Sequence, residues 1–135
     1  MDLTKSFPRS PYDTNAGLVM LPRTTDKARA QRTGLLGEYH YDCPLDQRLF
    51  QFLGIDAESF LKQLKKVGTD DGMAKWIAEI ADRSKVEREA FNNVLRHLRP
   101  EGDEGEQWLE QKRQDLGRAD FHTYFDQLDA DEGRF

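Results

Sequence analysis

The only cysteine of the chain lies in a short stretch whose residue types could support covalent catalysis. His40, Asp42 and Cys43 lie within four positions and directly precede Pro44. Because proline favours the first position of a helix, Cys43 is predicted at a helix N-terminus, where amide donors and the helix dipole favour a thiolate. In this interpretation Cys43 is a nucleophile, His40 is its base and Asp42 orients the base. In the alternative interpretation Cys43 and Asp42 only cap the helix, since lone cysteines are commonly small buried residues and a neighbouring carboxylate opposes thiolate formation.

The histidines and cysteine do not predict a metal site. His40 and Cys43 offer two ligands, whereas a structural zinc site uses four, and His97 and His122 lie on separate predicted helices without a paired ligand. The aspartates near the C-terminus lack the spacing of a calcium-binding loop and its closing glutamate. We therefore expect no metal and no cofactor.

A row of cations precedes the cysteine and is typical of a site for a small anion. The row consists of Arg23, Lys27, Arg29 and Arg32. Guanidinium groups hold carboxylates and phosphates through paired hydrogen bonds. Three further residues are predicted to bind the ligand, one through its carboxylate and two as an aromatic wall: Asp26, Tyr39 and Tyr41. In the alternative interpretation these charges form ion pairs that join the helix to the body, because runs of charge are more often solvated faces or surface pairs.

The cations lie on a predicted helix over residues 22–33. Pro22 suits the first helical position, and Gly34 suits the left-handed conformation that ends a helix. The interior of this helix has no large apolar residue, which is typical of a solvated surface element. The alternative is a helix that packs through charge pairs, small alanines and a bound ligand.

Apolar residues at helical spacing and capping residues predict the remaining helices. Their predicted ranges are about 44–53, 56–67, 70–81, 84–99, 106–116 and 119–128, and residues 101–106 are predicted to form an exposed acidic turn. Short connections favour antiparallel packing of neighbours. The sequence thus predicts an all-α fold: a compact single-domain bundle of about six to seven short helices over residues 1–135. Residues 1–20 would form an N-terminal arm with a minor strand near Leu18.

Composition limits the cellular setting and the partners. A single cysteine excludes an internal disulfide and fits a reducing compartment. The N-terminus lacks the apolar run of a signal peptide, and no apolar run approaches a membrane span, so we expect a soluble cytoplasmic protein that does not bind membranes. Residues 100–135 carry a net charge of −7, which disfavours binding to nucleic acid.

Several phrases of the sequence resemble the bacterial family known as Domain of Unknown Function 5069. The phrases are FPRSP at Phe7–Pro11, LPRTTDKARA at Leu21–Ala30, GEYHYDCPLDQ at Gly37–Gln47 and FLGID at Phe52–Asp56, with the opening MDLTKSFPRSP and the closing EGR at Glu132–Arg134. The resemblance covers nearly the whole chain. It implies a small, helical, stand-alone bacterial protein without an assigned activity, and it assigns no functional residue.

These observations favour a non-enzymatic binding or interaction module. Its polar helix and the following loop would form an Arg- and Lys-rich surface that recognises a small anionic ligand or a protein partner. One alternative is an enzyme in which Cys43 is the nucleophile, His40 is the base and an arginine holds a small anionic substrate. Another is a homo-oligomeric assembly subunit in which exposed aromatic residues near the C-terminus, Phe121, Tyr124 or Phe125, contact a second chain.

Overall fold

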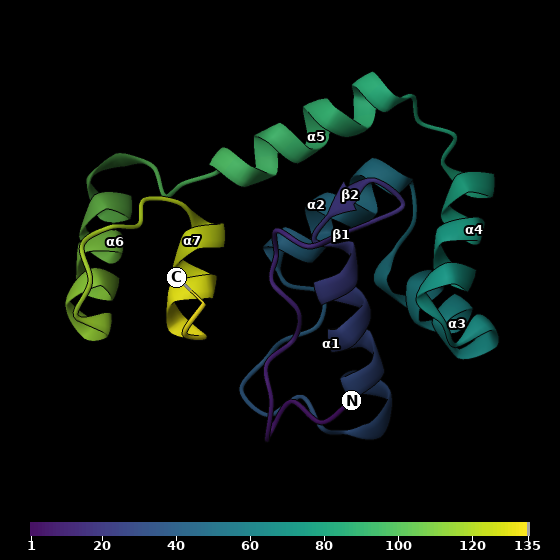
Figure 1. Cartoon of the computed structure of the whole chain (residues 1–135), viewed down its shortest axis with the longest axis horizontal. Coiled ribbons are helices and arrows are strands. Elements are labelled where there is room, and N and C mark those ends of the chain that lie inside the picture. Colours follow the sequence, from purple (N-terminus) through teal and green to yellow (C-terminus); the bar gives the residue numbers. More distant parts are fainter. Residues whose placement is uncertain (135) are drawn as a thin grey trace.

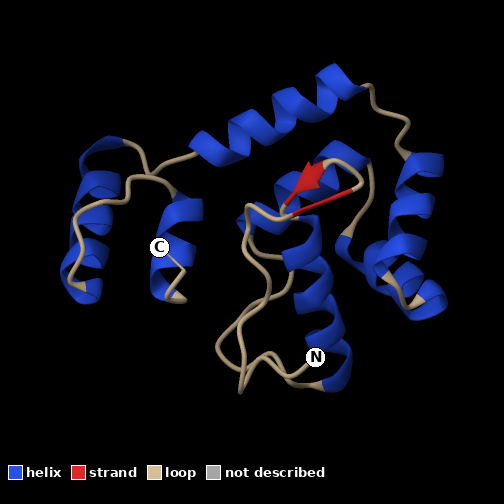
Figure 2. Ribbon diagram, viewed as in Figure 1, coloured by secondary structure: helices blue, strands red, loops and turns tan. Residues whose placement is uncertain are grey.

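A computed structural model describes residues 1–134, which contain seven helices and one two-stranded antiparallel hairpin (Figures 1 and 2). In chain order the elements are β1 (Thr14–Asn15), β2 (Leu18–Val19), α1 (Leu21–Thr33), α2 (Pro44–Leu53), α3 (Ala57–Val67), α4 (Asp70–Ile80), α5 (Lys85–His97), α6 (Gly102–Leu116) and α7 (Tyr124–Asp131). The predicted all-α class and the minor strand near Leu18 are confirmed. No helix among the described residues has the length and apolar character needed to cross a membrane.

Helix α1 occupies the middle of the molecule. Figure 1 shows α3 and α4 on one side of it, α6 and α7 on the other, and α5 crossing between the two sides above the hairpin. The main hydrophobic cluster joins α1 to the three helices that follow it, and its buried members are Leu18, Leu21, Ala28, Leu49, Phe50, Leu53, Phe60, Leu64, Met73 and Ile77. A second cluster joins the hairpin to α5 and α7 through Val19, Met20, Leu95 and Phe125.

The hairpin orients the start of α1. Thr14 pairs with Val19 and Asn15 pairs with Leu18. Asn92 of α5 clamps the turn, because its side-chain oxygen accepts a hydrogen bond from the Val19 N–H at 3.0 Å and its amide donates to the Gly17 carbonyl at 2.9 Å. The hairpin and α5 therefore fix where the polar helix begins.

The prediction that the helix over residues 22–33 is a solvated surface element is wrong. Every residue from Leu21 to Ala28 is buried, although the segment includes Arg23, Asp26 and Lys27. The alternative interpretation, packing through charge pairs and alanines, describes the structure. A polar helix can be buried when each of its polar groups has a hydrogen-bonding partner, and the sources of those partners are described below.

Two boundaries near the C-terminus differ from the prediction. Residues 101–106 were expected to form a turn, but α6 already begins at Gly102, with Asp103 and Glu104 in a first turn where the helix dipole favours acidic side chains. Gly105 permits this start because a Cβ atom there would lie 2.7 Å from the Pro100 carbonyl carbon. The last helix begins at Tyr124, where the Thr123 hydroxyl caps it by accepting a hydrogen bond from the Asp126 N–H at 3.1 Å.

The exposed aromatic surface expected near the C-terminus is not present. Phe121 and Phe125 have no exposed surface, and Tyr124 is half-buried with its ring packed against Trp108. Phe121 fills a third cluster with Leu109 and Ala130, and Phe125 belongs to the second. These rings are part of the core, so they do not support the proposed contact with a second chain.

Candidate ligand-binding site

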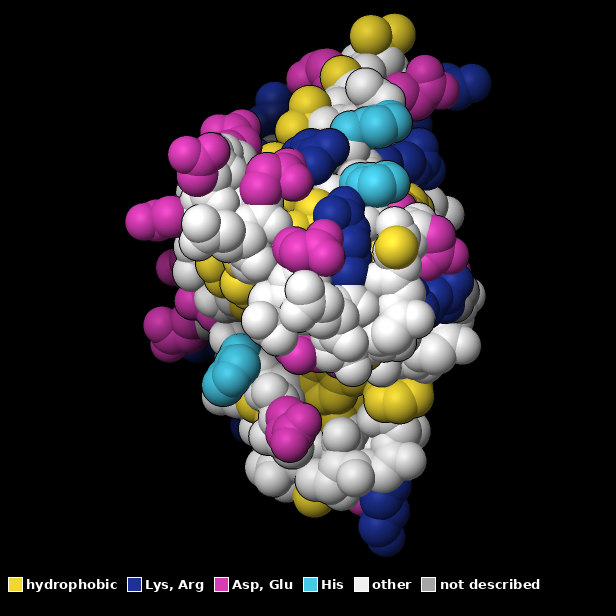
Figure 3. All heavy atoms as spheres, turned by 90° about the vertical axis from the view of Figure 1, so that its left-hand side faces the viewer, with side chains coloured by type: hydrophobic (Ala, Val, Ile, Leu, Met, Phe, Trp, Pro, Cys, Tyr) yellow, Lys and Arg dark blue, Asp and Glu magenta, His cyan; other side chains and the backbone are white. Residues whose placement is uncertain are grey.

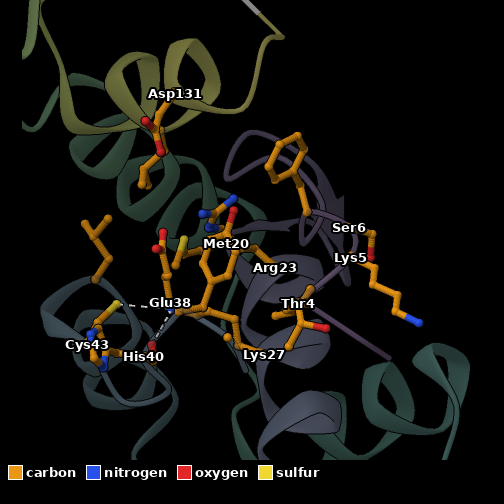
Figure 4. A pocket seen from close by; sticks show the side chains of 16 residues that line it. Thr4, Lys5, Ser6, Met20, Arg23, Lys27, Glu38, His40, Cys43 and Asp131 are labelled. Carbon is orange, nitrogen blue, oxygen red and sulfur yellow. Dashed lines mark hydrogen bonds between the residues drawn. The ribbon is translucent and has the colours of Figure 1, made fainter. Parts of the chain in front are cut away.

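A cavity of about 900 Å³ lies at the junction that the polar sequence motifs form. Five segments line it: the N-terminal arm, the α1 face around Arg23 and Lys27, the loop over residues 37–43, the start of α2 at Leu45, and α7 (Figure 4). Five of the eight residues predicted to form a site are among its lining: Arg23, Lys27, Tyr39, His40 and Cys43. Apolar side chains complete the wall, and they include Leu3, Phe7, Met20, Leu45 and Leu128.

Arg23 is bound by a carboxylate from the far end of the chain. Its guanidinium donates to Glu132 Oε1 at 2.9 Å and Oε2 at 2.7 Å, and it also donates to the Arg9 carbonyl at 3.1 Å. Tyr39 donates its hydroxyl to the same carboxylate at 2.7 Å, and the Arg23 guanidinium lies 5.6 Å from the centre of the Tyr39 ring. Burial would raise the pKa of Glu132, but the hydrogen bonds and charge of Arg23, with smaller contributions from Tyr39 and Arg134, lower it below the ordinary glutamate value.

Lys27 is held by a buried carboxylate from α2. Its Nζ lies 2.8 Å from Asp46 Oδ2, and it donates hydrogen bonds to the His40 carbonyl at 3.0 Å and to Cys43 Sγ at 3.2 Å. Lys27 thus combines one ion pair with two hydrogen bonds, all within the protein. Neither the Lys27 nor the Asp46 side chain exposes more than 4% of its surface.

Asp46 also organises the start of α2. Its Oδ1 accepts a hydrogen bond from the Thr24 hydroxyl at 2.6 Å, and its Oδ2 accepts from the backbone N–H groups of Asp42 and Cys43 at 3.0 and 3.2 Å. These two N–H groups precede the helix, where no carbonyl of α2 can accept them. One carboxylate therefore joins α1, the loop and α2.

Cys43 lies at the N-cap position of α2, as predicted, and it is partly buried in the cavity wall. The His40 side chain is exposed and lines the same cavity, but within residues 1–134 its ring makes no hydrogen bond to Cys43 or to another group. The predicted base and nucleophile are thus neighbours without a direct contact.

Three of the predicted site residues lie elsewhere. Asp26 and Arg29 are on the next face of α1, where Asp26 accepts hydrogen bonds from the backbone N–H and the guanidinium of Arg9 at 2.9–3.1 Å. Arg9 and Arg29 then both bind Asp70 of α4, at 2.8 and 3.0 Å. These hydrogen bonds, that of Arg9 first, lower the pKa of Asp70 against the effect of its burial. Tyr41 packs its ring near Phe50 and donates its hydroxyl to the Ala57 carbonyl at 2.8 Å, so it belongs to the core.

The model of a protein family described as Domain of unknown function (DUF5069) matches residues 5–134. The chain belongs to this family. The DUF5069 chain has no significant match among the curated proteins with which it was compared. The sequence motifs that resemble the family contribute to the arm, α1, the loop over residues 37–43 and the start of α2, all of which line the cavity.

Asp46 and Glu132, which bind the cations of α1, were not predicted from the sequence. The sequence patterns placed Asp46 only in the helix over residues 44–53 and gave Glu132 no role in binding a cation. Their roles depend on contacts over 19 and 109 residues, respectively, which local spacing does not encode. The only local signal was that Asp46 occupies the third position after Cys43, where an acidic side chain can cap a helix.

The Lys27–Asp46 pair generates a prediction about stability. Replacing Lys27 by methionine keeps most of the side-chain volume but leaves the Asp46 carboxylate buried without its cation. Such a loss costs about 3–5 kcal/mol of unfolding free energy. Urea unfolding of Lys27→Met should show this loss, whereas Lys62→Met, which removes an exposed pair with Glu58, should leave the midpoint nearly unchanged. Equal midpoints for the two variants would contradict the structural role of Lys27.

Acid should weaken the contact between α1 and α7. Because the pKa of folded Glu132 lies below its unfolded value of about 4.5, this carboxylate stabilises the fold above that pH, and the stabilisation is lost as the pH falls through the folded pKa. Burial raises the pKa of Asp129, whose contribution has the opposite sign. The unfolding free energy should therefore fall less steeply below about pH 5 in Glu132→Gln than in the wild type. Parallel pH profiles for the two proteins would contradict the pairing.

Proposed function

We propose that this protein is a small-molecule-binding module and that the cavity between α1, the loop over residues 37–43, the arm and α7 is its binding site. The observation that carries the proposal is the cavity itself. Its volume of about 900 Å³ falls in the range of natural ligand sites, which extends over roughly 300–1,000 Å³. Its wall combines apolar side chains with a few polar groups, which is the composition of such sites.

The polar groups of the cavity floor are fixed before any ligand enters. Arg23 is bound to Glu132, Lys27 is bound to Asp46, and all four side chains are almost fully buried. A site whose polar groups are already ordered loses less conformational entropy on binding than a flexible one. The internal ion pairs therefore support binding by giving the cavity a defined shape.

The part of the N-terminal arm that lines the cavity packs closely against the residues that follow α1. The Leu3 N–H donates to the Leu35 carbonyl at 2.9 Å, and the arm passes Gly37 so closely that a Cβ atom there would lie 2.9 Å from the Leu3 carbonyl oxygen. Gly37 has a φ of 61°, and Gly34 has a similar φ of 71°, but a Cβ at Gly34 would meet no atom within 4 Å. Gly34 and Gly37 therefore have similar backbone conformations, but only Gly37 contacts the arm, so Gly34 can serve as a control position.

This pair yields a test of the proposed site. Phenethyl alcohol, a neutral probe with an apolar body, should shift the amide NMR signals of residues 3–7, 37–43 and 128–131. Gly37→Ala should weaken this binding because the added methyl group displaces the arm, while Gly34→Ala should retain it even though both alanines are strained at positive φ. Shifts confined to other regions, or equal binding by the two variants at equal melting temperature, would reject the site.

A second candidate function rests on the contact between Lys27 and Cys43. An ammonium group 3.2 Å from the sulfur and a helix N-terminus are the surroundings in which reactive cysteines are found. In this candidate Cys43 acts as a nucleophile toward a bound substrate, with His40 recruited as base from the same wall. The absence of a His40–Cys43 hydrogen bond among the described residues makes it the weaker of the two.

Alkylation kinetics test the second candidate. If Cys43 is activated, iodoacetamide should modify it several-fold faster than glutathione at neutral pH, and His40→Gln should slow the reaction. Mass spectrometry gives the rate directly, because the chain has one cysteine. A rate at or below that of glutathione between about pH 6 and 9 would exclude an activated thiol.

A further inference from the structure

The two cations of α1 that line the cavity, Arg23 and Lys27, are already paired with carboxylates of the protein. Lys27 is ion-paired with Asp46 and donates hydrogen bonds to the His40 carbonyl and to Cys43, and Arg23 binds both oxygens of Glu132 as well as the Arg9 carbonyl. Each cation is matched by a buried carboxylate, so the floor of the cavity carries no net charge from these pairs. An anion would have to compete with Asp46 or Glu132 for donors that are already in use, at the cost of leaving a buried carboxylate unpaired.

Two carboxylates of the cavity wall have no such partner. Glu38 and Asp131 both line the cavity and are exposed, and neither makes a side-chain hydrogen bond or ion pair with any residue that the structure describes. Figure 4 shows Glu38 extending from the loop toward α7, the helix that carries Asp131. Lys5 also belongs to the lining, but its ammonium group points away from the other side chains in that view. The unpaired charge directed into the cavity is therefore negative.

The wall between these carboxylates is apolar and partly aromatic. Leu45 and Leu128 of the lining are partly exposed, and Phe7 exposes 54% of its surface although it lines the cavity. An uncovered aromatic face attracts a cation and gives no comparable attraction to an anion. Figure 3 shows that hydrophobic and acidic side chains are exposed beside one another on the face of the molecule formed by α6 and α7.

We propose that the ligand of this cavity is a small organic cation, such as a protonated amine with an apolar body, rather than an anion. The ammonium group lies between Glu38 and Asp131, and the body packs on Phe7, Leu45 and Leu128. This inference rests on the proposed function, because it names the ligand class of the same cavity. It replaces the anionic ligand suggested by the cation row, since those cations serve as internal partners of Asp46 and Glu132.

Three probes of similar shape test the charge preference: phenethylamine, phenethyl alcohol and phenylacetate. The comparison is made at about pH 8, where a primary alkylamine is protonated. From the strength of exposed ion pairs, phenethylamine should bind about three- to tenfold more tightly than the alcohol, and phenylacetate more weakly than either. Added salt should reduce the advantage of the amine because it screens exposed charges.

Two double variants test whether Glu38 and Asp131 cause the preference for the amine over the alcohol. Glu38→Gln combined with Asp131→Asn should abolish the amine's advantage over the alcohol while leaving alcohol binding within about twofold. Glu79→Gln combined with Asp82→Asn changes the net charge equally at two exposed positions of the α4 region and should keep the advantage.

Two other outcomes of the probe experiment would contradict the inference that the ligand is a cation. If the alcohol binds in the cavity as tightly as the amine, or phenylacetate binds most tightly, the cationic class is wrong while the binding site stands. If none of the three probes binds, the proposed function fails, and the inference fails with it.

Discussion

The fold depends on cations of one helix being neutralised by carboxylates that come from other parts of the chain. Asp46 of α2 holds Lys27, and Glu132, directly after α7, holds Arg23, in both cases with almost no exposed surface. A buried charge without its partner is strongly destabilising, so α1 can occupy the centre only when α2 and the C-terminal segment are in place. The same logic applies to Asp26, which is 1% exposed and is bound by Arg9 of the arm. The arm, α2, α7 and α1 are therefore interdependent.

This arrangement explains why some of the structure could be predicted from the sequence and some could not. Helices α2 to α5 have apolar residues at helical spacing and local caps such as Ser84 with Glu87, so their ranges were predicted closely. The limits of α1 were also predicted, from Pro22 and Gly34. Its burial was not, because a helix rich in charge is solvated unless distant residues supply partners, and Glu132 lies 109 positions away.

The candidate site shows the same division. Five residues that the sequence singled out, Arg23, Lys27, Tyr39, His40 and Cys43, line one cavity. The sequence left open whether the cations bind a ligand or form ion pairs, and the structure gives Arg23 and Lys27 internal partners. The sequence also overlooked Glu38 and Asp131, whose significance depends on their facing a cavity without a partner. The residue types indicated where polar side chains would cluster. Whether the unpaired charge at the cavity is positive or negative depends on which ion pairs form in the folded protein.

The ion pairs of α1 have a structural role next to the proposed binding site. They join α1 to the arm, to α2 and to Glu132, and residues of the same parts of the chain line the cavity. The contact of the arm with Gly37 and the Asp46 cap at the start of α2 help to position that lining. Substitutions of Arg23 or Lys27 would therefore change stability and cavity shape together, so loss of binding in them alone would not identify a ligand contact.

Hydrogen exchange of the α1 backbone tests the central claim most directly, namely that this polar helix is the buried centre of the fold. Amides in a core element exchange only through global or near-global unfolding, whereas those of a solvated helix exchange through local opening. The account predicts that the amides of residues 25–30 exchange as slowly as those of the core helix α3, and far more slowly than those of the exposed first turn of α6. Exchange of α1 at rates close to those of the α6 first turn would contradict it.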